Sequence, residues 1–373
     1  MNFWALANHA DVRAGFRDVQ RFSNSWGGVS MDPSAYGPDA HKSMSFLAMD
    51  DPPKHMRIRK LVSKGFTPRR VNDLAGRITA LTHQHWSKCL DMGEFDYVHD
   101  FAALLPMDVV SELLGVPRSR PYTSAAPVRS APSSRGRCPR HPPRPRSTRT
   151  SNCTSTIRNS SPTGGRVPGE DLVSALIEAE IDDDATREKI RLTEDEIVGF
   201  MVLMVVAGNE TTTKLLANAL YWGGWRNPDE LAKVFADPEL AVPQWTEETL
   251  RYDNSTQIVV RRVIEDAPYG DHVIPAGDRV LLLVGSANRD QEVFGPDADK
   301  YDIGRDNGQA LMSFGLGAHF CLGAHLARLE ANIGLGEVIR SIRAVDIDID
   351  KAVRVHSVNV RGFAELPVKV TVR

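Results

Sequence analysis

The segment from Phe314 to Gly323 (FGLGAHFCLG) constrains this chain most, because this glycine-rich loop brings Cys321 to the start of a predicted helix. Glycines let a backbone turn sharply and approach a flat ligand. A helix N-terminus lowers the pKa of a thiol through its free N–H groups and its positive dipole. The pattern makes Cys321 a candidate ligand or nucleophile, and the alternative is a small buried side chain.

Two other kinds of cysteine site are less well supported. A nucleophilic hydrolase needs a base with its own orienting group, and only His319 and His325 stand nearby. A zinc site needs clustered ligands, and the chain has no CxxC motif. The four cysteines of the chain are too few and too unevenly spaced for a disulfide framework, and we assign no role to Cys89, Cys138 and Cys153.

The composition is that of an ordinary globular protein, with 42% hydrophobic and 25% charged residues, which excludes collagenous, coiled-coil and wholly disordered chains. The longest strongly apolar stretch, Ile197 to Gly208, is shorter than the ~20 residues of a membrane span. The first residues lack the basic and then apolar pattern of a signal peptide. We therefore expect a cytoplasmic protein without a membrane segment.

Residues 118–165 differ from the rest, since they contain ten arginines and eight prolines but no lysine, aspartate or glutamate. Such a segment cannot bury enough apolar surface to offset its chain entropy, so we expect disorder. A pair of compensating frame shifts in GC-rich DNA would give the same composition. An arginine-rich arm for nucleic acid is a third interpretation, which the lack of an aromatic platform disfavours.

The remaining chain has mainly helical periodicity with short β-branched runs. A capping box in the segment LTEDE, residues 192–196, predicts the start of a long apolar helix through Trp222. The sequence thus predicts one mostly α domain with minor β over residues 1–373. The other expected elements are helices over 9–18, 50–65, 68–90, 101–116, 170–179, 246–252 and from 321 past 340, and strands over 3–6, 258–264, 273–274, 279–284 and within 353–372.

Three further motifs stand in a fixed order before the cysteine loop: AGNETT at 207–212, ETLR at 248–251, and NRD at 288–290 followed by FGP at 294–296. Together with that loop they resemble the cytochrome P450 family in order and approximate spacing, outside residues 118–165. The resemblance implies the P450 fold, with Cys321 as the axial thiolate ligand of haem iron, in contact with the segment of Phe314, Gly315 and Gly323.

The resemblance also implies roles for polar residues elsewhere. Glu210 and Thr211 would deliver protons for oxygen activation beside a helix thinned at Gly208, although such a hydroxyl can simply bond to the previous turn. Glu248 and Arg251 would be structural, near the proximal side of the haem. The two haem propionates would bind four residues that could otherwise be surface groups: His55, Arg59, Arg261 and His319.

Similarity suggests substrate contacts that core packing would explain equally well: Phe46, Leu47, Val206, Ala207, Gln257, Ile258, Val358 and Asn359. Most of these side chains are apolar, which suits a small hydrophobic substrate. The implied reaction is monooxygenation of a lipid, terpene, sterol or polyketide-like molecule, with haem b and O2. Electrons from NAD(P)H would come through a separate ferredoxin and ferredoxin reductase.

Two departures from the family pattern support an alternative function. The chain starts at what resembles the second strand of the family's first sheet, so we expect earlier N-terminal elements to be missing. Residues 118–165 occupy the place of the lid helices over the distal pocket. Because a lid excludes water from the reaction, the alternative is a catalytically impaired haem-binding remnant.

Overall fold

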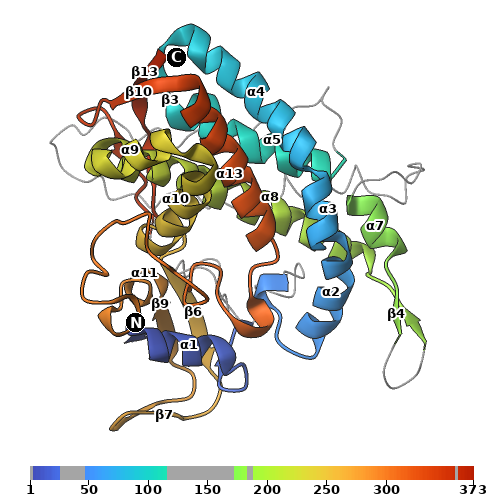
Figure 1. Ribbon diagram of the computed structural model, residues 1–373. Coiled ribbons are helices and arrows are strands. Elements are labelled where there is room, and N and C mark those ends of the chain that lie inside the picture. Colours follow the sequence, from blue (N-terminus) through green and yellow to red (C-terminus); the bar gives the residue numbers. More distant parts are fainter. Residues whose placement is uncertain (1–2, 26–46, 116–171, 183–187, 358–359) are drawn as a thin grey trace, which may run out of the picture.

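The computed structural model describes residues 3–25, 47–115, 172–182, 188–357 and 360–373. Figure 1 shows a helical body with two small sheets at opposite ends, one near the label N and the other near the label C. The expectation of a mostly α protein with minor β is confirmed. The segment 118–165, for which we expected disorder or a frame shift, lies outside the described residues.

Most of the described residues lie in helices. The α-helices are α1 (His9–Arg17), α2 (Lys54–Val62), α3 (Pro68–Asp73), α4 (Ala75–Met92), α5 (Leu104–Leu113), α7 (Leu172–Glu178), α8 (Glu194–Leu220), α9 (Pro228–Ala236), α10 (Pro238–Tyr252), α11 (Val284–Ala287), α12 (Gln291–Phe294) and α13 (Ala324–Ser341). Short 3-10 segments are η2 (Leu47–Met49), η3 (Ser63–Gly65) and η7 (Gly317–His319), and π-helical segments are η4 (Val98–Ala102) and η6 (Tyr221–Arg226). Among the described helices, none combines the length and apolar character that a membrane span requires.

Helix α8 is the central element, and it packs on α5, α10 and α13. The expected capping box is confirmed, because the Thr193 hydroxyl accepts from the Glu196 N–H at 3.3 Å and the Glu196 carboxylate accepts from the Thr193 N–H at 2.9 Å. The helix then continues without a break to Leu220, where the π-helical η6 follows. A single rigid element therefore carries the AGNETT motif through the middle of the molecule.

The sheets are small and frame the helices. The first has the order β1-β9-β6-β2, with β1 parallel to β9 and the other pairs antiparallel, and the second has the antiparallel order β10-β13-β3. Three two-stranded ladders pair β4 with β5, β7 with β8 and β11 with β12. The strands are β1 (Phe3–Leu6), β2 (Phe22–Ser23), β3 (Glu94–Asp96), β4 (Ile181–Asp182), β5 (Lys189–Ile190), β6 (Ile258–Val263), β7 (Ala267–Tyr269), β8 (His272–Ile274), β9 (Arg279–Leu283), β10 (Ile342–Ile347), β11 (Val353–Arg354), β12 (Phe363–Glu365) and β13 (Pro367–Val372).

Several expected helices differ from the observed ones in their bounds, since the helix expected from residue 50 begins at Lys54 and the one expected from residue 101 begins at Leu104. The segment 68–90 forms two helices, α3 and α4, which meet at Leu74. The helix expected to begin at Thr246 begins at Pro238, because the Asp237 side chain caps it and Pro238 occupies the first turn, where a missing N–H costs nothing. Pro243 inside this helix concealed the pattern from the sequence.

Candidate functional site

The cysteine loop is pressed against helix α1. Gly315 and Gly317 have φ values of 65° and 69°, which favour glycine. A Cβ on Gly315 would lie 3.3 Å from the Phe16 ring, and one on Gly317 would lie 3.3 Å from the Phe16 carbonyl oxygen. These two glycines are therefore required by turns and by packing on α1. Among the described residues, no atom lies within 4 Å of the position that a Cβ on Gly323 would take, so space remains there.

The Cys321 residue is accessible to solvent, yet the thiol lies deep enough for burial to raise its pKa. The N–H of Gly323 and the charges of Arg59 and Arg328 act in the opposite direction but do not outweigh burial. The expected lowering of the thiol pKa by the helix start is therefore wrong for the protein alone, because desolvation is the larger effect. The backbone N–H of Cys321 donates to the Phe314 carbonyl at 2.9 Å, which fixes the loop.

Four groups that can carry positive charge meet beside this loop, although three different segments supply them. His55 and Arg59 lie on α2, Arg261 lies on β6, and His319 ends η7. The rings of His55 and His319 have centroids 3.9 Å apart and tilt by 33°. Neither ring nitrogen of His55 has a hydrogen-bond partner, and Nε2 of His319 also has none, among the residues described here.

The electrostatics of this cluster show a surplus of positive charge. Burial, the largest effect, and the neighbouring His55, Arg261 and Arg59 together lower the pKa of His319 to about 3. Burial also lowers the pKa of Arg261 to about 10, and only Asp51 counters this. Arg261 is 3% exposed and donates to the neighbouring Val260 carbonyl at 2.9 Å. The cluster would therefore be stabilised by an anionic ligand.

Helix α8 is buried at both ends and exposed to solvent in its middle. Val206 is 64% exposed, and Ala207 and Glu210 are also exposed, on one face of the helix. The Thr211 hydroxyl donates to the Ala207 carbonyl at 2.7 Å, so the simple bond to the previous turn does occur. A Cβ on Gly208 would lie 2.9 Å from Val110 Cγ2, so packing on α5 accounts for this glycine.

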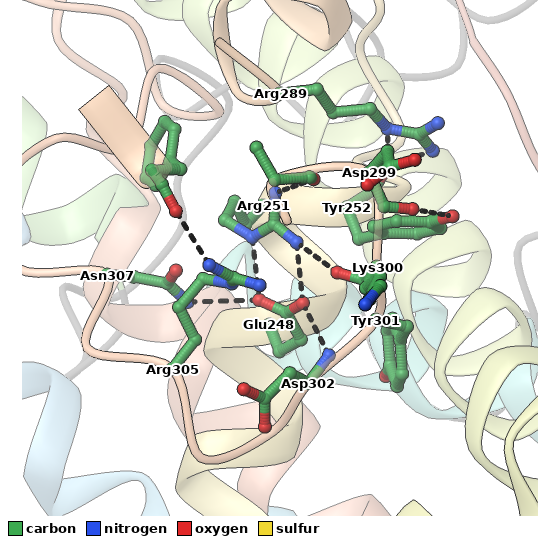
Figure 2. Close-up of polar contacts among 12 residues, drawn as sticks. Glu248, Arg251, Tyr252, Arg289, Asp299, Lys300, Tyr301, Asp302, Arg305 and Asn307 are labelled. Carbon is green, nitrogen blue, oxygen red and sulfur yellow. Dashed lines mark hydrogen bonds and ion pairs between the residues drawn. The ribbon is translucent and has the colours of Figure 1, made fainter. Parts of the chain in front are cut away.

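Glu248 and Arg251 form a fully buried ion pair with two hydrogen bonds of 2.7 Å, as Figure 2 shows. The guanidinium also donates to three backbone carbonyls, those of Asn288, Ala298 and Lys300. Neither side chain is exposed, so this is not the solvated ion pair that an E-x-x-R motif alone would favour. The pair instead ties α10 to the loops on either side of α12.

The NRD motif connects this ion pair to the cysteine loop. The Asn288 side chain accepts from the Met312 N–H at 2.8 Å and donates to the Ser313 hydroxyl at 2.8 Å. Arg289 lies 3.9 Å from the centroid of the Tyr252 ring and donates to the Tyr252 carbonyl, as Figure 2 shows. These contacts fix the chain that enters the loop at Phe314.

The expected substrate contacts are only partly brought together. Val206 and Ala207 lie on the open face of α8, and Ile258 is half-buried at the start of β6. Leu47 is 5% exposed and packs in a core with the first half of α8, which favours packing for this residue. The Gln257 amide donates to the Asn254 carbonyl at 2.6 Å. Phe46, Val358 and Asn359 lie outside the described residues.

One buried polar residue of α8 was not predicted from the sequence. Lys214 is 6% exposed and lies one helical turn after Glu210, on the same side of the helix. The sequence feature that could have indicated its burial is a lone lysine followed by the apolar residues Leu215 and Leu216. A lysine in such surroundings is rarely buried without a partner.

Comparisons with known proteins agree on one family. A family model described as Cytochrome P450 matches residues 240–353. A relative from Mycobacterium tuberculosis (strain H37Rv) named putative cytochrome P450 123 is 49% identical, over 100% of this chain and 90% of the relative. The vitamin D(3) 25-hydroxylase of Pseudonocardia autotrophica is 33% identical, over 98% of this chain and 87% of that protein. The solved structure of CYP109E1 from Bacillus megaterium in complex with corticosterone has a TM-score of 0.80 and 28% identity, over 98% of this chain and 92% of that chain.

Proposed function

The chain belongs to the cytochrome P450 family of haem-dependent monooxygenases, and we propose that Cys321 ligates the haem iron and that the substrate is a small hydrophobic molecule. The observation that carries this proposal is the cluster of His55, Arg59, Arg261 and His319, which has surplus positive charge and unpartnered ring nitrogens. Haem brings two propionates, which supply the missing negative charge and the missing hydrogen-bond acceptors.

The surroundings of Cys321 fit the rest of the cofactor. Cys321 is accessible, and within the described part of the chain no atom lies within 4 Å of where a Cβ on Gly323 would be. A metal-bound thiol is deprotonated despite a pKa that burial has raised. Phe314 and Gly315 give the loop its shape, through the hydrogen bond to the Cys321 N–H and through the turn against Phe16.

Thiolate-ligated haem iron, when bound, supplies the activation of O2. Glu210 and Thr211 are proposed to move the protons that this reaction consumes. Glu210 is exposed on the open face of α8, where it can exchange protons with water. The Thr211 hydroxyl donates its hydrogen bond to the Ala207 carbonyl, so its oxygen lone pairs remain able to accept a hydrogen bond from the open face of α8. Glu248 and Arg251 are proposed to support the loop without touching the reacting atoms.

The proposed substrate class is a lipid, terpene, sterol or polyketide-like molecule. Val206 and Ala207 offer an exposed apolar surface on α8, and we propose Ile258 as a further contact, with Phe46 and Val358. The relatives are consistent with this class, since one is named for vitamin D(3) and a solved relative holds corticosterone.

We propose that electrons come from NAD(P)H through a ferredoxin and its reductase in the cytoplasm. The basic residues of α2 and α3 would give an acidic ferredoxin a favourable surface, because Lys60 of α2 and Arg69 and Arg70 of α3 are exposed.

The test is turnover under labelled oxygen. The purified protein, a ferredoxin, a ferredoxin reductase and NADPH are incubated with corticosterone or vitamin D3 under 18O2, beside a Cys321→Ala variant. The proposal predicts a product with one 18O atom from the wild type and none from the variant. Haem binding without a labelled product from any apolar probe would instead support an impaired haem-binding remnant.

A further inference from the structure

Arg57 of α2 forms an ion pair with Glu196 in the first turn of α8. Nη1 of Arg57 donates to Oε2 of Glu196 at 3.3 Å and Nη2 donates to Oε1, so the guanidinium binds both carboxylate oxygens. Oε2 also accepts from the Thr193 N–H at 2.9 Å, within the capping box. The capping box therefore fixes the carboxylate that Arg57 binds, and the pair joins two helices that are far apart in the chain.

The surroundings of this pair distinguish it from a surface ion pair. The Glu196 side chain is 8% exposed and that of Arg57 is 30% exposed. Burial, the largest single effect, would raise the pKa of Glu196, but the hydrogen bonds from Arg57 and Thr193 lower it below its usual value. Removal of Arg57 would therefore leave a poorly solvated carboxylate without its counter-charge.

Arg57 lies on the face of α2 opposite to the residues that we assign to haem. It stands two positions after His55 and two before Arg59, and two positions turn an α-helix through slightly more than half a turn. His55 and Arg59 are four positions apart, so they share one face. Helix α2 therefore contacts Glu196 with one face and contributes to the cationic cluster beside Cys321 with the other.

The cationic cluster opposes its own assembly when no anion is present. His55, Arg261 and Arg59 all lower the pKa of His319, after the larger effect of burial. The rings of His55 and His319 are nevertheless in contact, with centroids 3.9 Å apart. Because groups that can carry like charge repel one another in a poorly solvated site, other contacts must hold α2 beside the cysteine loop.

Apolar packing supplies only part of that hold. Ile58, Leu61 and Val62 of α2 pack in a core with the first half of α8. Such contacts stabilise the approach of two helices, but they are non-directional, so they fix the rotation and sliding of α2 less well. A guanidinium that binds both oxygens of a fixed carboxylate is directional, and it therefore defines where α2 stands relative to α8.

We propose that Arg57 and Glu196 are positioning residues for the haem site, which hold α2 against the repulsion of the cationic cluster and keep His55 and Arg59 in place for the propionates. This inference rests on the proposed function, because it takes haem to be the ligand of the cluster. Neither residue touches the cofactor. A site that is already ordered before its ligand arrives loses less free energy on binding, so the pair should strengthen haem binding.

The first experiment measures haem release by transfer to an excess of apomyoglobin. Arg57→Gln and Glu196→Gln each remove one charge, and a glutamine at position 196 can still complete the capping box. We expect each variant to release haem about tenfold faster than the wild type, because a charge-assisted pair is lost. Arg57→Lys should lie between them and the wild type, because lysine keeps the charge without the planar fork.

A pair of the same chemistry elsewhere in the molecule is the matched control. Arg77 of α4 binds Glu112 of α5, with Nε 2.8 Å from Oε1 and 2.6 Å from Oε2. Neither helix carries a residue of the cationic cluster. Arg77→Gln should therefore change haem release less than about twofold. Equal acceleration by Arg57→Gln and Arg77→Gln would overturn the inference.

A double-variant cycle separates positioning from general stabilisation. If Arg57 acts through Arg59, Arg57→Gln should accelerate haem release only about threefold in a protein that already carries Arg59→Gln. A merely structural role would multiply the two separate effects, and that result would contradict the inference. If Arg57→Gln does not fold, as judged by circular dichroism of the haem-free protein, the same cycle is made with Glu196→Gln or Arg57→Lys.

The reduced carbon monoxide spectrum of every sample separates this inference from the proposed function. A wild type without a thiolate-ligated haem spectrum would refute both. A normal wild-type spectrum, with haem release from Arg57→Gln and Glu196→Gln as slow as from the wild type, would refute only the positioning role.

Discussion

The imidazole rings of His55 and His319 lie 3.9 Å apart between centroids, although 263 residues separate them in the chain. One comes from α2 and the other from the loop that presents Cys321, so their contact joins two of the three segments that form the cationic cluster. The pKa of His319, about 3, shows how strongly burial and the neighbouring cations oppose a further positive charge there. The cluster is therefore built to receive negative charge.

Removing one cation of this cluster should weaken haem binding. Arg261→Gln is expected to raise the haem dissociation constant roughly 10- to 100-fold, because a charge-assisted hydrogen bond contributes about 1.5–3 kcal/mol. Transfer of haem to an excess of apomyoglobin, followed by absorbance, measures this. Arg262→Gln is the control, since adjacent strand residues face opposite sides of the sheet. Equal haem loss from the two variants would be evidence against the propionate role.

The buried ion pair of Glu248 and Arg251 should contribute far more to the free energy of unfolding than the partly exposed pair of Glu247 and Arg328. Glu248→Gln removes one partner of a pair with no exposure, which is expected to lower the free energy of unfolding by about 3–5 kcal/mol. Glu247 is adjacent in sequence but pairs with Arg328 at the surface, so Glu247→Gln should cost about 1 kcal/mol or less. Urea unfolding of both variants gives the comparison, and similar losses would contradict the structural assignment of Glu248.

Glu330 makes stability depend on pH. This residue of α13 is 2% exposed, its Oε2 lacks a partner among the described residues, and burial raises its pKa to about 8. The folded protein therefore holds a proton that the unfolded chain releases near 4.5, so the free energy of unfolding falls as pH rises from about 4.5 to about 8.

Glu330→Gln should remove this dependence and stabilise the protein by roughly 2–4 kcal/mol at pH 8.5 relative to pH 5. Thermal unfolding of the wild type and the variant at several pH values measures the difference. A constant difference between the two proteins over this range would show that Glu330 does not titrate as described.

Substitution by alanine should change the stability of the protein at Gly315 but not at Gly323, the two ends of the cysteine loop. Gly315→Ala introduces a Cβ at positive φ, 3.3 Å from the Phe16 ring, and should cost about 1–2 kcal/mol with or without haem. Gly323→Ala meets no protein atom within 4 Å, so it should leave the haem-free protein unchanged. If the cofactor occupies that space, the same variant loses haem affinity. Destabilisation of the haem-free Gly323→Ala protein would contradict this description.

Motifs of short spacing predicted much of the site, whereas contacts between residues far apart in the sequence could not be predicted from such motifs. The capping box of α8 and the order of the motifs depend on short spacings, which a sequence displays directly. The proximity of His55 and His319 depends on how α2 packs against the cysteine loop, and a charge pattern cannot show this. The raised pKa of Cys321 was also missed, because helix position is visible in a sequence whereas burial is not.

Glycines illustrate the same limit. Gly208 was expected to thin its helix, and Gly315 and Gly317 to allow a sharp turn and the approach of a flat ligand. The positive φ values confirm the turns, but Val110 and Phe16 lie where a side chain at these positions would be. Lys214 was overlooked because only the crossing of Gly362 and Phe363 makes it buried. In each case the partner lies far away in the sequence.

The most direct test of the account is the absorption spectrum of the reduced, haem-supplemented protein under carbon monoxide, with Cys321→Ala and Cys89→Ala beside it. Cys89 is the other described cysteine, and it is buried in α4 away from the loop. The account predicts a strongly red-shifted Soret band in the wild type and in Cys89→Ala, and its loss in Cys321→Ala. A wild type without that band, or a band that survives in Cys321→Ala, would contradict the assignment of Cys321 as the haem ligand.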